Sequence, residues 1–254
     1  MKALILAAGY ATRLYPLTKE YPKPLLKVGN RPIIDYILDK LRGIEGLDEI
    51  IVVTNSKFFL KFKAWVSHSK EKKRISLVDD MTRTLSDRRG AIGDMHFVVK
   101  KKRLDDDLLV VGGDNIFDGD LKSFIDFARA HCPYSVIGIH DLKDRASASK
   151  YGVIKLDRKN MIADFKEKPK KPGSSLVAMC LYYFPKEKLG LLNEYLKSKA
   201  NKHDATGFYI DWLRKKDPTY GFVFGGRWYD IGDAKFFSQA KVAYSKNRRS
   251  FRNA

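Results

Sequence analysis

A short loop near the start of the chain holds the residues best suited to phosphate chemistry. It follows an apolar run, Lys2 to Leu6, that is typical of a buried strand, and open parallel sheets bind ligands beyond the carboxyl ends of their strands. Small residues let the backbone approach a ligand, while a hydroxyl and a guanidinium suit phosphate. These candidates are Leu6, Ala7, Ala8, Gly9, Thr12 and Arg13. The loop matches neither a dinucleotide fingerprint nor a Walker loop, and a tight turn with a surface arginine is the alternative interpretation.

Two further segments place single charges where a phosphate or a metal could be held. Pro22 and Pro24 restrict the backbone on either side of Lys23, so its ammonium is presented as a fixed point charge. Gly113 and Asp114 follow a fully apolar run, and a carboxylate at that edge of a parallel sheet is well placed to hold Mg²⁺ together with substrate phosphates. An irregular turn around the lysine and a turn-capping aspartate are the structural alternatives.

Three more charged candidates lie later in the chain. Asp230 ends a short strand and is a second carboxylate able to bind a metal, although the spacing does not show whether it meets Asp114. Glu167 and Lys168 pair a carboxylate with an ammonium, which suits a polyol phosphate, and a basic surface turn is the alternative. The five histidines show neither metal-ligand spacing nor a nearby nucleophile pattern, so they are interpreted as structural.

Net charge is the unusual feature of the composition. The 254 residues include 49 Lys and Arg against 30 Asp and Glu, and the resulting charge of +19 favours anionic partners of any kind: phosphorylated metabolites, nucleic acid or an acidic membrane surface. No RNP, KH or zinc-finger signature accompanies the basic clusters, so no specific nucleic-acid partner is predicted. No apolar run approaches the ~20 residues of a membrane span. Cys132 and Cys180 form no C-x-x-C motif, which indicates reduced thiols in a cytoplasmic protein.

The elements that must position these residues alternate between short apolar strands and amphipathic helices. Strands are expected at residues 2–6, 50–53, 75–78, 107–111, 134–139, 151–156, 161–165, 176–184, 222–224 and 228–231. Helices are expected after Pro32, after a cap at Ser56, at 121–131, twice between about 186 and 216, and at 233–244. This pattern predicts an α/β fold, with a doubly wound, mostly parallel, Rossmann-like sheet and helices on both faces. Residues 1–245 are predicted to form one domain, followed by a basic tail at 246–254.

Taken in order, the motifs resemble those of the sugar-1-phosphate nucleotidyltransferases, also called nucleotide-sugar pyrophosphorylases, and most closely the glucose-1-phosphate thymidylyltransferase branch. The family opening L-A-x-G-x-G-T-R-L-x-P-L-T, followed by P-K-P, is similar to Leu6 through Thr18 and then Pro22 to Pro24. The remaining family motifs G-D, Y-G-V, E-K-P and W-x-D-x-G appear as Gly113-Asp114, Tyr151 to Val153, Glu167 to Pro169, and Trp228 to Gly232. The likeness extends from about residue 2 to 244.

The resemblance implies a catalytic domain with a nucleotide-binding half at about 1–140 and a sugar-binding half at about 141–245. It implies a Mg²⁺-dependent enzyme of nucleotide-sugar biosynthesis, in which a sugar 1-phosphate oxygen attacks the α-phosphorus of a nucleoside triphosphate and pyrophosphate leaves. Because that nucleophile is already an anionic phosphate, catalysis needs alignment and charge neutralisation rather than a general base. No membrane partner is implied, and relatives of this kind commonly form homo-oligomers.

The resemblance also implies a role for each matching residue. The residues that would act in catalysis are Arg13, Lys23, Asp114 and Lys168. Those that would bind the nucleotide are Leu6, Ala7, Ala8, Gly9, Thr12, Arg13, Gly90 and Asp114. Those that would bind the sugar phosphate are Tyr151, Gly152, Glu167, Lys168 and Tyr182. The metal ligands would be Asp114 and Asp230.

Some positions depart from the family pattern. Ala11 replaces a glycine, Cys180 stands where glycine is frequent, and Asp233 stands where threonine is common. The segment Arg88 to Ile92, which would select the base, fits no thymine, uracil or cytosine pattern. Two alternatives stay open: a cytidylyltransferase for phosphocholine or inositol phosphate, and a non-catalytic regulatory module that binds nucleotide. The presence of both metal-binding carboxylates argues against the module.

Overall fold

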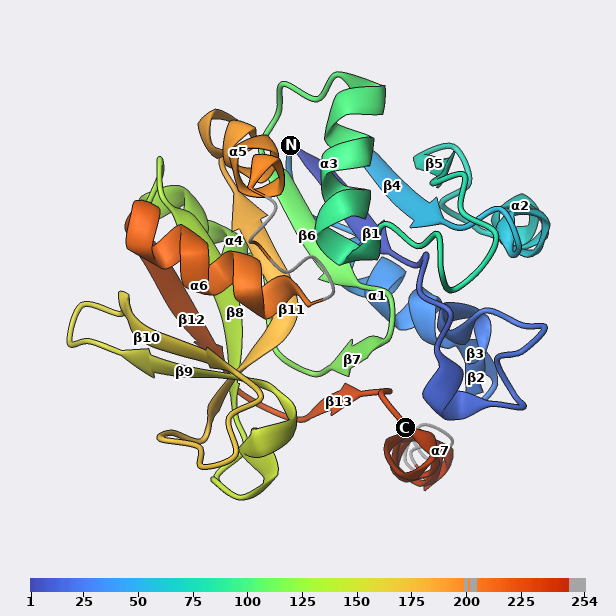
Figure 1. The fold of residues 1–254 in the computed structure, drawn as a ribbon. Helices are drawn as coiled ribbons and strands as arrows, with labels where there is room; N and C mark the ends of the chain where they lie inside the picture. Colours follow the sequence, from blue (N-terminus) through green and yellow to red (C-terminus); the bar gives the residue numbers. More distant parts are fainter. Residues whose placement is uncertain (199–200, 202–204, 247–254) are drawn as a thin grey trace.

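The computed structural model describes residues 1–198, 201 and 205–246, and its centre is a nine-stranded sheet (Figure 1). The strands of this sheet are β1 (Lys2–Leu6), β4 (Glu49–Thr54), β5 (Ile75–Asp79), β6 (Leu108–Gly112), β8 (Ser135–Asp141), β9 (Gly152–Leu156), β10 (Ile162–Glu167), β11 (Leu176–Phe184) and β12 (Thr219–Phe224). Their order is β10-β9-β11-β6-β1-β4-β5, with β8 also pairing with β11 and β12 pairing with β8. Every strand expected in this sheet from the apolar runs is therefore present.

The first half of the chain builds the parallel part of the sheet. β1 lies between β4 and β6 and runs parallel to both, so that Leu4 pairs with Ile51 on one side and with Val110 on the other. These three residues are fully buried, as expected for parallel strands covered on both faces. Antiparallel pairing begins at β11, which lies beside β6 and β8. The predicted α/β sheet is confirmed, and its parallel pairs are β1 with β4 and β6, β4 with β5, and β12 with β8.

Helices cover both faces of the sheet, as predicted (Figure 1). The helices are α1 (Ile33–Leu41), α2 (Phe59–His68), α3 (Gly90–Lys102), α4 (Leu121–Ala130), α5 (Gly190–Lys197), α6 (Thr206–Lys216) and α7 (Ala234–Lys246). Alternate residues of each strand point to opposite faces. Ile5, Val52 and Val111 pack with α1, α2 and α4, whereas Leu4 and Val110 pack with α3, α5 and α6. Within the described residues, no helix is long and apolar enough to cross a membrane.

Two small antiparallel pairs complete the frame of the site. β2 (Lys27–Val28) pairs with β3 (Arg31–Pro32), and β7 (Asn115–Phe117) pairs with β13 (Trp228–Asp230). In the second pair Asp230 lies opposite Asn115, the residue that follows Asp114. The indole of Trp228 donates a hydrogen bond to the Asn115 side-chain oxygen at 2.6 Å, and the Ile231 amide donates to the Asp114 carbonyl at 3.1 Å. This pairing fixes the two aspartates beside each other.

The apolar pattern did not predict α3. Its sequence includes Gly90 and Gly93, which have low helix propensity, and its polar residues obscure the amphipathic stripe. Tertiary packing nevertheless buries Ile92, Met95 and Val98 at helical spacing against the sheet. Burial on the sheet therefore stabilises a helix whose local sequence is weak.

The predicted helix cap at Ser56 is wrong. Phe58 precedes α2, and no side-chain cap forms there. The Ser56 hydroxyl instead donates to the carboxylate of Asp79 at the end of β5, at 2.8 and 2.9 Å. Asn55 supplies the local support, since its side-chain oxygen accepts the Phe58 amide at 3.0 Å. The hydroxyl thus joins the ends of β4 and β5 rather than starting a helix.

The domain boundaries drawn from the sequence stay predictions. Residues 246–254, expected to be a basic tail, lie outside the described residues except for Lys246, which ends α7. The division into a nucleotide-binding half and a sugar-binding half also stays a prediction, because it depends on where each ligand binds. Strands from both halves belong to the same sheet.

Candidate active site

Three sequence motifs meet at the carboxyl end of β1. The amide of Gly113 donates to the carbonyl of Leu6 at 2.9 Å, which joins the G-D motif to the start of the glycine loop. A Cβ at position 113 would lie 2.7 Å from that carbonyl and 3.1 Å from the ring of Pro24. Only glycine leaves room for this three-way contact. The loop after β1, the P-K-P segment and the end of β6 are therefore packed together.

The glycine loop offers an open backbone at this edge. Ala7 is held to β4 by its amide, and the Ala8 carbonyl accepts the Asn55 side chain at 2.8 Å. A Cβ at Gly9 would meet no atom within 4 Å, so a ligand has free access there. Ala11, where related sequences carry glycine, adopts a left-handed conformation with φ of 49°. That backbone region explains the family glycine and costs about 1 kcal/mol for alanine.

Lys23 and Asp114 form the tightest ion pair at the site. Lys23 opens the short 3-10 helix η2 (Lys23–Leu25), and its Nζ lies 2.5 Å from Oδ2 of Asp114. Both side chains are largely shielded from solvent. The pair holds an ammonium and a carboxylate ready at the same point, within reach of one phosphate and its counter-ion.

Asp230 and Arg13 complete this charged cluster. Burial, and then the negative charge of Asp114, raise the pKa of Asp230 to about 7, whereas Lys23 and Arg13 lower it. Arg13 lies in the 3-10 helix η1 (Thr12–Leu14), and its guanidinium would be 3.9 Å from a Cβ at Gly232. Four charged groups from four separate segments thus influence one another across a small space.

The two carboxylates would suit a magnesium ion whose remaining ligands came from substrate. Mg²⁺ is commonly bound through one or two carboxylates plus phosphate oxygens and waters. Burial, and then repulsion from Asp114, raise the pKa of Asp230, and a divalent cation held by both carboxylates would offset that repulsion. Among the described residues, no group of three or more His, Cys, Asp and Glu side chains is arranged to hold a metal without other ligands.

A cavity of about 150 Å³ adjoins the charged cluster. It collects all five residues predicted to bind sugar phosphate together with two of the charged residues above, Arg13 and Asp230. The lining residues are Arg13, Lys150, Tyr151, Gly152, Phe165, Glu167, Lys168, Ala178, Cys180, Tyr182, Thr206, Gly207, Asp230, Gly232, Asp233 and Phe236. Of the predicted nucleotide-binding residues, Arg13 lines this cavity, whereas Leu6, Ala7, Ala8, Gly9, Thr12, Gly90 and Asp114 do not.

Glu167 is the buried acid of the cavity. Its carboxylate lies 3.6 Å from the ammonium of Lys168, and burial raises its pKa while Lys168 lowers it. A Cβ at Gly207, in the first turn of α6, would lie 1.9 Å from Oε2 of Glu167, and one at Gly152 would lie 3.2 Å from the same atom. Sequence reasoning missed Gly207 because a glycine near a helix start carries no distinguishing signal.

The other departures from the family pattern have local explanations. Cys180 adopts φ of 53° where β11 changes register, a conformation that favours glycine. Burial raises the pKa of its thiol to about 12, so the sulfur stays protonated and is not a nucleophile. Asp233 accepts the amides of Lys235 and Phe236 at 3.0 and 3.1 Å and thereby caps α7. Threonine would serve the same cap.

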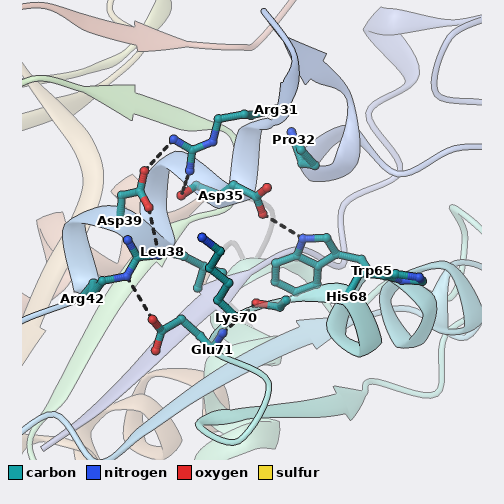
Figure 2. Close-up of a pocket in the computed structure, with 11 residues that line it drawn as sticks. Arg31, Pro32, Asp35, Leu38, Asp39, Arg42, Trp65, His68, Lys70 and Glu71 are labelled. Carbon is teal, nitrogen blue, oxygen red and sulfur yellow. Dashed lines mark hydrogen bonds and ion pairs between the residues drawn. The ribbon is translucent and has the colours of Figure 1, made fainter.

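A larger cavity, of about 530 Å³, lies between α1 and the end of α2 (Figure 2). Its polar groups bind one another: Arg31 pairs with Asp39 at 2.6 Å, and Arg42 pairs with Glu71 at 3.0 Å. The indole of Trp65 donates to the carboxylate of Asp35 at 2.9 Å. None of the predicted site residues lines it. The smaller cavity is therefore the candidate active site.

Comparison with known proteins agrees with this geometry. A family model described as nucleotidyl transferase matches residues 2–247. The chain is 32% identical to the bifunctional protein GlmU of Methanococcus aeolicus over 97% of this chain and 55% of that protein. It is 30% identical to a mannose-1-phosphate guanyltransferase of Saccharomyces cerevisiae over 96% of this chain and 64% of that protein. The chain thus spans about half to two thirds of the length of these relatives.

Solved structures share the fold. A putative glucose-1-phosphate thymidylyltransferase from Bacillus anthracis superposes with a TM-score of 0.83 at 23% identity, covering 96% of this chain and 95% of that one. A UDP-glucose pyrophosphorylase bound to UDP-glucose superposes with a TM-score of 0.82 at 22% identity, covering 97% and 98%. At these identities the likeness establishes the architecture alone.

Proposed function

This chain belongs to the nucleotidyl transferase family, and we propose that it transfers a nucleotidyl group from a nucleoside triphosphate to a sugar 1-phosphate. One observation carries the proposal. The charged cluster of Arg13, Lys23, Asp114 and Asp230 directly adjoins a cavity that contains a buried carboxylate and an ammonium. Nucleotidyl transfer needs this combination, since one part must hold a triphosphate and the other a phosphorylated acceptor.

The proposed reaction is a direct displacement at phosphorus. An oxygen of the acceptor phosphate forms a bond to the α-phosphorus, the bond between that phosphorus and the bridging oxygen breaks, and pyrophosphate leaves with the electron pair. Lys23 would neutralise charge around the α-phosphate, and Arg13 would stabilise the departing pyrophosphate. Mg²⁺, when held by Asp114 and Asp230, would supply further charge neutralisation and alignment. No proton transfer is required, because the attacking oxygen is already anionic, so the proposed reaction needs no general base.

The acceptor is proposed to be a sugar phosphate because the cavity is lined by groups that can bind hydroxyls and a phosphate. Glu167 accepts hydrogen bonds from hydroxyl groups, and Lys168 provides a cation beside it for the phosphate. The hydroxyl of Tyr182 donates a hydrogen bond to the hydroxyl of Thr206 at 2.7 Å, and both residues line the cavity. Names of relatives support the same class, since they include a mannose-1-phosphate guanyltransferase and a glucose-1-phosphate adenylyltransferase. A cytoplasmic location, use of Mg²⁺ and a homo-oligomeric state remain predictions.

The direct test is pyrophosphate release. Five nucleoside triphosphates, each with Mg²⁺, are combined with several sugar 1-phosphates, phosphocholine and inositol phosphate. We expect turnover with at least one sugar 1-phosphate, and its loss in Asp114→Asn. Asp126→Asn is the matched control, because Asp126 also pairs with a lysine, Lys122, at 2.6 Å but lies exposed on α4. Turnover with phosphocholine or inositol phosphate alone would show that the acceptor is not a sugar 1-phosphate and would favour the cytidylyltransferase alternative. Nucleotide binding without any turnover would favour the regulatory module.

A further inference from the structure

A hydrogen-bonded chain of four side chains lies beside the glycine loop and has no part in the proposed mechanism. Asp94 of α3 shares a hydrogen bond with Asp80, which directly follows β5. Asp80 accepts from Thr82 twice, through the backbone amide at 2.7 Å and the hydroxyl at 3.0 Å. The hydroxyl of Tyr10, the neighbour of Gly9, lies 3.3 Å from that of Thr82 and donates to it, since the Thr82 proton is already engaged. The chain connects α3 to the loop after β1.

The carboxyl pair at the head of this chain must contain a proton. Asp80 is 1% exposed and Asp94 is 6% exposed, and neither forms an ion pair with a described residue. Two carboxylates cannot hydrogen-bond without a shared proton, and Oδ1 of Asp94 is buried without any partner. Asp80, whose oxygens accept from Thr82, is the natural acceptor, so Asp94 is the donor. Consistently, burial and then the charge of Asp80 raise the pKa of Asp94 to about 8.

Other charged groups around the pair have been considered. Arg89 lowers the pKa of Asp94, but its Nε donates to the Asp80 carbonyl at 2.7 Å, and its guanidinium lies over the Phe97 ring. The remaining titratable groups near the pair are the acids Asp79 and Asp87 and the phenol of Tyr10, which stays neutral because burial raises its pKa. Burial and the charge of Asp80 oppose ionisation of Asp94, so the surroundings favour the neutral acid.

Thr82 is the buried anchor of an exposed loop, residues 81–89. Its carbonyl accepts the Ser56 amide at 2.9 Å, and its side chain is 4% exposed, whereas Met81 beside it is 63% exposed. The loop lies beyond the carboxyl ends of β4 and β5 and leads into Gly90, next to the glycine loop. Ligands of such sheets bind at this edge. The position of Thr82 thus determines where loop 81–89 lies relative to Gly9, where a ligand has free access.

We propose that Asp94 is a positioning residue for nucleotide binding: as a neutral acid it donates to Asp80 and so holds Thr82 and Tyr10 beside Gly9. The identity of the ligand, a nucleoside triphosphate, rests on the proposed function. Loss of the Asp94 proton brings two buried negative charges into contact. The expected response is separation of Asp80 from Asp94, which frees Thr82 and loosens loop 81–89.

The test uses Asp94→Asn, because an amide donates to Asp80 as the neutral acid does but cannot lose its proton near neutral pH. Binding of ATP, GTP, CTP, UTP and dTTP, each with Mg²⁺, is measured by calorimetry at pH 7.5 and 9.5. For whichever of these nucleotides binds, we expect the wild-type Kd to weaken by about tenfold or more over this range, and that of Asp94→Asn by less than about twofold. Asp94→Ala, which has no donor, should bind weakly at both pH values. In turnover, KM for the nucleotide should follow this pattern while kcat at saturation stays unchanged.

A second readout separates this inference from the proposed function. Amide hydrogen exchange of residues 80–90, corrected for intrinsic rates, should accelerate with pH in the wild type and not in Asp94→Asn. Equal pH dependence of the two proteins, in exchange or in binding, would overturn the positioning role. Failure of every nucleotide to bind would count against the proposed function, while the exchange experiment would still decide whether Asp94 holds the loop.

Discussion

At the residue scale, the most constrained contact of the site is between Gly207 and Glu167. Because a Cβ at position 207 would lie 1.9 Å from Oε2 of Glu167, Gly207→Ala must displace that carboxylate. We expect kcat/KM for the acceptor to fall by about tenfold to 100-fold, mainly through KM, since small misplacements of positioning groups have effects of this size. Steady-state kinetics with varied sugar 1-phosphate measure it.

Gly190→Ala is the matched control for this substitution. Gly190 also lies at a helix start, in α5, but a Cβ there would meet no atom within 4 Å. Its replacement should leave kinetics unchanged and raise the free energy of unfolding by up to about 1 kcal/mol. An unaltered acceptor KM in Gly207→Ala would show that Glu167 does not bind the acceptor.

The aspartate pair makes metal affinity depend on pH. The pKa of Asp230 is raised from 3.8 to about 7, so its contribution to folding stability is full below the unfolded value and is lost as pH rises through about 7. Mg²⁺ competes with that proton, because it binds the ionised form. We expect the calorimetric Kd for Mg²⁺ to tighten between pH 5.5 and 7.5 and then level. Metal affinity that is independent of pH, or that survives in Asp114→Asn, would contradict this metal site.

At the element scale, the pairing of β7 with β13 determines whether the two aspartates meet. Trp228→Phe removes the indole donor to Asn115, which is 3% exposed, and an unpaired buried oxygen costs about 1–3 kcal/mol. Trp228 also packs beside Tyr151, with ring centroids 5.3 Å apart. We therefore expect Tm to fall by several degrees and the Mg²⁺ concentration needed for half-maximal activity to rise.

Trp65→Phe provides the comparison for this element. It also removes an indole hydrogen bond, the 2.9 Å bond to Asp35, but in the cavity between α1 and α2. It should reduce stability without changing the magnesium requirement. If both variants lowered activity in proportion to Tm alone, β13 would have no positioning role.

The elements also show which features a single sequence can and cannot predict. The strands around β1 could be predicted, because a strand buried on both faces must be almost continuously apolar, as Leu108 to Val111 are. The helix α3 could not, since its stability comes from packing rather than from its own residues. Motifs located Asp114 and Asp230 individually. Their proximity depends on the pairing of two three-residue strands that are far apart in the sequence, since Asn115 and Trp228 are 113 positions apart. No local pattern encodes such a pair.

At the scale of the whole molecule, the site is assembled from both ends of the chain. Arg13 and Asp230 both line the smaller cavity, and the charge of Arg13 lowers the pKa of Asp230. Phe237 of α7 belongs to the same buried apolar cluster as Leu14, Val28 and Ile33. The closing helix therefore supports the loop that carries Arg13. This closure agrees with the family match, which extends over residues 2–247.

The charge of +19 is also a property of the whole molecule, and it gives the last prediction. Basic residues on scattered surfaces attract any polyanion, so a protein of this charge should bind duplex DNA weakly. We expect a Kd of roughly 10⁻⁴–10⁻⁶ M at physiological salt and a steep loss of affinity as salt rises. Fluorescence anisotropy over a salt series measures this binding. Because the proposed substrates bind within the charged cluster and its cavity, duplex should not inhibit pyrophosphate release at 150 mM salt. Tight, sequence-selective binding that persists at high salt would instead identify nucleic acid as a specific partner.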